Sequence, residues 1–157
     1  SEEGLNGKEE DNTMRMSSEI LIDASHVFER MLKCEMAEKR TMQITVCAES
    51  LKDVDDMLYY LMVNDLRKDV NPRTLIKLAH LYELKGLFAA CCTRIVADLT
   101  VDTFMESAGI FNRYEIERGF DQMVQVGTRN LKDIRAVDTF NDLPFFFRFG
   151  HLRARKG

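Results

Sequence analysis

The sequence predicts a mainly α-helical domain with one short strand, an arrangement of the α+β class. From residue 17 onward, apolar residues recur three or four positions apart, which is the spacing of a helix stripe. Only residues 42–47 alternate apolar with polar side chains as a half-buried strand does. The composition is that of a globular protein, since 45% of the 157 residues are hydrophobic and 31% are charged. This length allows one domain and a helical extension.

The chain is predicted to begin with a disordered leader and a first helix. Residues 1–16 show almost no apolar periodicity, so they bury too little surface to offset the entropy of ordering. A helix is then expected from Ser17 to about Lys33. Its apolar stripe consists of Ile20, Ala24, Val27, Phe28 and Met31.

The expected strand at residues 42–47 is β-branched at its centre, and a second helix is expected after it. Ser50 can cap that helix with its hydroxyl, while Asp53 lies in the first turn near the positive end of the helix dipole. Asn64 and Asp65 then indicate a turn.

A helical hairpin is predicted next. Asn71 and Pro72 form a strong helix start, because Asn can accept from unpaired amides and Pro has no amide to leave unpaired. Gly86 is expected to end this helix in a left-handed conformation, and a second helix is expected over residues 87–99.

A second helical pair is predicted over residues 100–136. Thr100 can cap its first helix, a further helix is expected from about Glu115, and Gly127 interrupts the pattern. Residues 137–157 form an aromatic and basic tail, and the four phenylalanines within residues 145–149 are expected to fold back onto this pair.

Charge and motif spacing exclude several kinds of function. A formal charge of −4 gives no broad positive field for nucleic acid, and no apolar run approaches the length of a membrane span. The three histidines are isolated and the four cysteines have no metal-ligand spacing, so neither a metal nor another cofactor is expected.

Cys91 and Cys92 lie on an apolar helix face, which favours packing over nucleophilic chemistry. Adjacent acids such as Asp55 and Asp56 are expected only to solvate the outer face of a helix. No catalytic group is therefore predicted. The cysteines, which are expected to be free thiols, favour a reducing compartment, the cytoplasm or the nucleus.

The order of elements and several short motifs resemble the BTB/POZ domain. Residues 17–32 are similar to the family's H-K-x-x-L-x-x-x-S-x-x-F-x-x-M helix, although the leading His-Lys is absent. The most specific similarity is that of residues 75–87 to the hairpin motif L-L-x-L-A-x-x-Y-x-x-x-x-L. Residues 62–64, Met-Val-Asn, replace the family's usual Tyr-Thr-Gly turn. Residues 100–136 resemble the 3-box or BACK region that follows BTB domains in ligase adaptors.

The resemblance implies a truncated BTB/POZ helical core over residues 17–99. The family's N-terminal dimerisation helix, and the two strands that pair with residues 42–47, have no counterpart in residues 1–16. The lone strand leaves unpaired backbone groups. It is expected either to be held loosely or to pair with another copy, which would make a homodimer through an edge strand.

The resemblance also implies a substrate adaptor of a ubiquitin ligase built on the scaffold protein cullin three. In such adaptors a hydrophobic residue followed two positions later by Glu contacts the cullin, and Met36, Ala37 and Glu38 match that pattern. The same surface is expected to include Tyr60, Asn64, Leu66, Phe111 and Tyr114. The alternative is a BTB-type assembly or transcriptional scaffold that binds no cullin.

Overall fold

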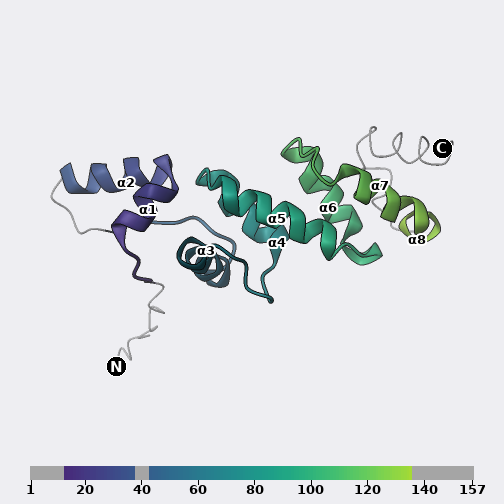
Figure 1. The fold of residues 1–157 in the computed structure, drawn as a ribbon, viewed down its shortest axis with the longest axis horizontal. Helices are drawn as coiled ribbons and strands as arrows, with labels where there is room; N and C mark the ends of the chain where they lie inside the picture. Colours follow the sequence, from purple (N-terminus) through teal and green to yellow (C-terminus); the bar gives the residue numbers. More distant parts are fainter. Residues whose placement is uncertain (1–12, 38–42, 136–157) are drawn as a thin grey trace, which may run out of the picture.

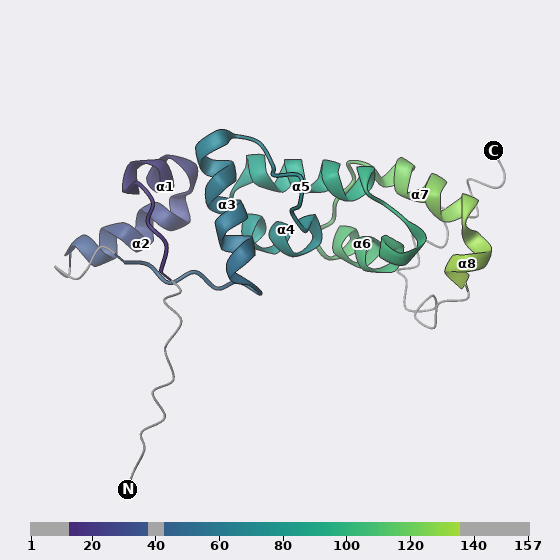
Figure 2. The same ribbon diagram turned by 90° about the horizontal axis from the view of Figure 1, so that it is seen from below.

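The protein is a row of helices, as expected for a mainly α fold (Figure 1). The structure, a computed structural model, describes residues 13–37 and 43–135. Two views at right angles place α1 and α2 at one end, α3 to α5 in the middle, and α6 to α8 at the other end (Figure 2). The helices are α1 (Ser18–Ala24), α2 (His26–Ala37), α3 (Leu51–Val63), α4 (Pro72–Leu81), α5 (Lys85–Ala97), α6 (Val101–Arg113), α7 (Phe120–Arg129) and α8 (Leu131–Arg135).

The first predicted helix is divided in two at Ser25. This residue has an extended backbone, with φ −152° and ψ 127°, between α1 and α2. Its hydroxyl oxygen accepts from the backbone N–H of Val27 at 3.1 Å and of Phe28 at 3.3 Å, and the hydroxyl donates to the carbonyl of Tyr82. Ser25 therefore caps α2 and ties it to the end of α4.

Residues ahead of α1 also pack more closely than predicted. Residues 13–16 were expected to belong to the disordered leader, yet Met16 is half-buried against the core. One apolar side chain thus finds enough contact to hold this stretch beside the helices. Residues 1–12 of the expected leader, and residues 136–157, which include the aromatic tail, lie outside the described residues.

The predicted strand at residues 42–47 is not formed in the part of the chain that the structure describes. Residues 43–47 alternate between exposed and half-buried side chains, as a strand does, but they have no strand assignment. The reason is that no other described segment offers them a hydrogen-bonding edge. Ile44 and Val46 nevertheless pack against the core.

The central helices begin and end largely where the sequence predicts. Ser50 accepts from the N–H of Asp53 at 3.2 Å, and Asn71 accepts from the N–H of Arg73 at 3.1 Å. The hydroxyl of Thr74 donates to the carboxylate of Asp53 at 2.9 Å, so the starts of α3 and α4 are joined. The helices α4 and α5 pack against each other as the predicted hairpin. Fully buried core side chains include Phe28, Met57, Leu75, Ile76, Leu87 and Ile95.

The turn between α4 and α5 differs from the prediction at Gly86. The left-handed residue is Glu83, with φ 53°, whereas Gly86 lies inside the first turn of α5. A Cβ at Gly86 would lie 3.0 Å from the hydroxyl oxygen of Tyr60. The close approach of the Tyr60 side chain from α3, and not the turn, therefore favours glycine here.

The second helical pair also departs from the prediction in its boundaries. Thr100 and Thr103 form the expected cap, each side chain accepting from the other residue's N–H. Glu115 does not start a helix but has a left-handed φ of 52°, and α7 begins only at Phe120. Gly127 does not interrupt a helix but lies within α7, where a Cβ would come within 2.9 Å of the Phe104 ring. The helix ends instead at Asn130.

Candidate protein-interaction surface

Two of the three residues with the strongest predicted role lie at the end of α2. Met36 and Ala37 form the last turn of that helix, and Glu38 lies outside the described residues. In both views α2 ends at one extremity of the row of helices (Figures 1 and 2).

The end of α3 presents a second group of predicted residues. Asn64 caps α3 in the left-handed conformation, with φ 61°, and its side chain is exposed. The N–H of Leu66 donates to the Asp65 carboxylate at 2.8 Å, and the Leu66 side chain is half-buried against the core. Met62 and Val63, which precede this turn, are 59% and 51% exposed, so the surface here is partly apolar.

A charged cluster fixes the shape of this turn. The guanidinium group of Arg67 donates to Asp55 at 2.5 Å and to Asp56 at 3.3 Å, and it lies 4.4 Å from the centroid of the Tyr59 ring. Lys52 donates to the other oxygen of Asp56 at 2.6 Å. Asp56 is buried, which corrects the prediction that both acids only solvate the helix face. Burial is tolerated because two cations satisfy the carboxylate.

Tyr60 and Tyr114 both lie against the start of α5, but on different sides of it. Tyr60 approaches Gly86, and burial raises the pKa of its phenol. The Tyr114 ring lies edge-on to Phe88, with centroids 5.8 Å apart, and 4.5 Å from the His80 ring. Positions two apart on a helix differ by about 200° in direction, so Gly86 and Phe88 face opposite ways.

Phe111 cannot contact a partner directly, contrary to the prediction. Its side chain is fully buried in the core beneath α6. The periodic pattern identified an apolar position correctly but could not distinguish a core residue from a surface anchor. The structure therefore brings Tyr60, Asn64 and Leu66 together at the end of α3, while Tyr114 lies separately beside His80.

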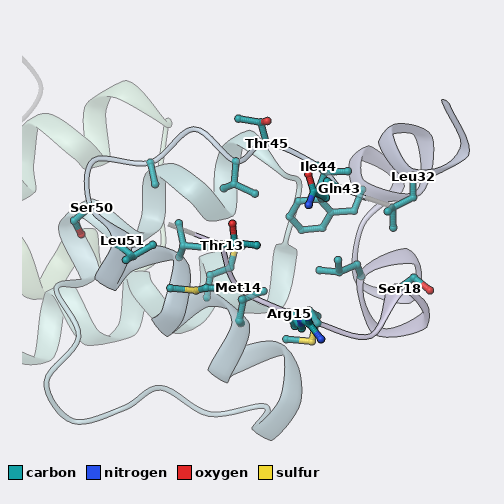
Figure 3. A pocket seen from close by; sticks show the side chains of 18 of the residues that line it. Thr13, Met14, Arg15, Ser18, Leu32, Gln43, Ile44, Thr45, Ser50 and Leu51 are labelled. Carbon is teal, nitrogen blue, oxygen red and sulfur yellow. The ribbon is translucent and has the colours of Figure 1, made fainter. Parts of the chain in front are cut away.

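A hollow of about 900 Å³ is a surface feature that the sequence did not indicate (Figure 3). Residues 13–16 and residues 43–46 line it from two sides, and its apolar floor includes Leu21, Phe28 and Met57. The alternation of residues 43–47 was the signal for one side. The sequence of residues 13–16 contained no signal for the other side of the hollow.

The buried cysteines and the spacing of possible metal ligands can be assessed in the described residues. Burial raises the pKa of the Cys91 thiol to about 12, and the pKa of Cys92 is raised for the same reason, so both are held as thiols. No group of three or more His, Cys, Asp or Glu side chains converges as metal ligands in residues 13–37 and 43–135. None of the helices there is long and apolar enough to cross a membrane.

Comparison with known families supports a role in protein recognition. No curated protein matched the sequence. The BTB/POZ domain model matches residues 8–99, which is more than half of the chain and begins ahead of Ser17. The match covers α1 to α5 and the segment between α2 and α3. This chain therefore belongs to the BTB/POZ family of protein-interaction domains.

Proposed function

We propose that this chain is a substrate adaptor that docks a cullin-three ubiquitin ligase through the end of α2. The observation that carries the proposal is that Met36 and Ala37, which Glu38 follows in the sequence, are the last two residues of a helix that ends at one extremity of the row of helices. A flexible thioether can adapt to a groove on a partner helix, and a carboxylate can add a polar anchor. The protein would act in the cytoplasm or nucleus as an interaction module without catalysis of its own.

The end of α3 supports this proposal as a second contact region. Asn64, Leu66 and the exposed Met62 and Val63 form a partly apolar edge whose backbone is held by the Arg67 cluster. A pre-ordered edge loses less conformational entropy when it binds. Tyr114, which directly follows α6, would widen the contact surface. Phe111 would support that surface only from within the core.

A pull-down with purified cullin three tests the proposal. Met36→Asp combined with Glu38→Ala is expected to weaken binding by about 30-fold or more, as loss of an interface anchor costs on the order of 2 kcal/mol. Leu81→Asp is the matched control, because it places the same charge on an exposed apolar residue at the end of α4. Equal binding by all three proteins would refute the docking site.

The second candidate is a BTB-type assembly or transcriptional scaffold that binds no cullin. One observation favours it, namely that Met62-Val63-Asn64 departs from the Tyr-Thr-Gly turn of the resemblance. Absence of any cullin binding by the unaltered protein would favour this function over the first.

A further inference from the structure

The hollow between α1, α2 and α3 is lined mostly by apolar side chains. Those that remain partly exposed include Met16 ahead of α1, Ile44 and Val46 of the extended segment, and Val54 of α3. Leu51, the first residue of α3, also lines the hollow and is 46% exposed. Apolar surface in a concave site favours an apolar occupant, because binding removes that surface from water.

The charges and the size of the hollow restrict the occupant further. The charged lining residues are Arg15 and Glu49, and Glu49 is already paired with Lys77. Figure 3 shows Leu51 and Leu32 on opposite sides of the hollow. Its volume of about 900 Å³ is that of a site for a drug-sized molecule, and a few aromatic side chains have a similar bulk. A short apolar segment with little charge therefore fits.

One stretch of this chain outside the described residues has that character. Residues 1–12 and 38–42 contain only one Leu and one Met among polar and charged residues. Residues 143–149, Leu-Pro-Phe-Phe-Phe-Arg-Phe, carry four phenylalanines and a single charge. The thioethers of Met14 and Met16, which line the hollow, are flexible and pack well against aromatic rings. We propose that the hollow binds residues 143–149 of a second copy of this chain.

A second copy is required because the chain's own tail is too short to reach the hollow. In both views α8 lies at the far end of the row from α1 and α3 (Figures 1 and 2). The helices α5 and α7, of 13 and 10 residues, follow each other along the row and occupy about 35 Å at about 1.5 Å per residue. The width of α3 adds about 10 Å. From Arg135 to Phe145 a fully extended chain spans at most about 36 Å.

The contact is heterologous, since the tail of one copy meets the hollow of the next. Each pair formed in this way still has one free tail and one free hollow, so copies add head to tail until a ring closes or a chain grows. This arrangement differs from strand pairing about a two-fold axis, in which both copies use the same surface. It goes beyond the proposed cullin docking and does not depend on it.

Two variants test the contact from its two sides. Leu51→Asp places a charge in the hollow, and an acidic residue at the start of α3 is compatible with the helix dipole. Phe146→Ser with Phe147→Ser removes two aromatic side chains of the tail. Light scattering is expected to show assembly of the unaltered protein at about 100 µM, and association about tenfold weaker or more for each variant. Leu81→Asp is the matched control and should assemble normally, because Leu81 is 52% exposed but does not line the hollow.

A mixture of the two variants distinguishes tail docking from any other contact. The Leu51→Asp chain keeps an intact tail, and the doubly substituted chain keeps an intact hollow. An equimolar mixture at about 100 µM is therefore expected to form a one-to-one dimer that grows no further, whereas each variant alone stays largely monomeric.

Three outcomes would overturn the proposal. A monomeric unaltered protein at about 100 µM would leave the tail on α6 to α8 of its own chain or in solvent. Assembly of either variant alone as strongly as the unaltered protein would place the interface elsewhere. A mixture of the two variants that stays monomeric would show that tail and hollow are not complementary. Cullin binding is measured separately on the same samples, so the failure of one proposal is distinguishable from the failure of the other.

Discussion

Asp56 is the residue that most directly holds the turn after α3 in place. Its buried carboxylate binds Lys52 and Arg67, one on each oxygen. Asp56→Ala removes the carboxylate that accepts hydrogen bonds from both Lys52 and Arg67. We expect this change to lower the free energy of unfolding by about 2–3 kcal/mol. Asp55→Ala is the matched control, because the Asp55 side chain is half exposed and should lose much less. Urea denaturation measures both, and equal losses would show that burial of Asp56 does not matter.

The four cysteines divide into two classes by their exposure to solvent. Cys34 and Cys47 are exposed, whereas Cys91 and Cys92 are buried and have raised pKa values. We therefore expect two thiols to react rapidly with a thiol reagent at pH 8, and the other two to react only as the protein unfolds. Rapid labelling of all four would contradict the packing of α5. Cys34→Ser with Cys47→Ser should abolish the fast phase.

Among the helices, the break between α1 and α2 depends on a single hydroxyl group, that of Ser25. Ser25→Ala removes a cap of α2 and the bond to the Tyr82 carbonyl, and we expect a loss of about 2 kcal/mol in unfolding free energy. Ser17→Ala is the control, because Ser17 precedes α1 without making a side-chain cap. Thermal unfolding of the two variants compares them, and equal stability would show that Ser25 has no special role.

The packing of α7 on α6 depends on Gly127. An alanine there would place its Cβ 2.9 Å from the Phe104 ring, so Gly127→Ala should destabilise the protein by about 1–3 kcal/mol. Gly109→Ala is a matched change in α6, where nothing lies within 4 Å. It should stabilise the helix by about 0.5–1 kcal/mol through propensity alone. Changes of the same sign in urea denaturation would contradict the close contact.

The sequence predicted those elements whose signals are local. The caps at Ser50, Asn71 and Thr100 each require only a side chain and an amide two or three residues away. The division at Ser25 could not be predicted in this way, since its hydroxyl bonds to Tyr82, 57 residues further along. The role of Gly86 likewise depends on a tyrosine of another helix.

For the candidate surface too, the sequence predicted the character of individual residues but not the contacts between distant segments. A periodic pattern marks Phe111 as apolar, but burial beneath α6 depends on how helices pack. Similarly, adjacent acids in α3 point in different directions, and only the folded turn brings Arg67 to Asp56. The hollow required the meeting of residues 13–16 with residues 43–46, two segments separated by α1 and α2.

At the scale of the whole molecule, stability should fall from the centre of the row toward residues 43–47. The helices α4 and α5 contain core side chains that are fully buried, such as Leu75, Ile76 and Leu87. Their amides can exchange only when much of the core opens. The amides of Ile44 and Val46 have no described backbone partner, so opening of the core is not required for their exchange.

Hydrogen exchange on a dilute, monomeric sample measures this difference. We expect the amides of Ile44 and Val46 to exchange at least about a thousandfold faster than those of Leu75 and Leu78, because global unfolding free energies lie near 5–15 kcal/mol. The amide of Cys47 should be intermediate, since it donates to the Tyr82 phenol, and Tyr82→Phe should make it as fast as its neighbours. Protection of Ile44 equal to that of Leu75 in the dilute monomer would mean that its backbone already has a partner within one chain.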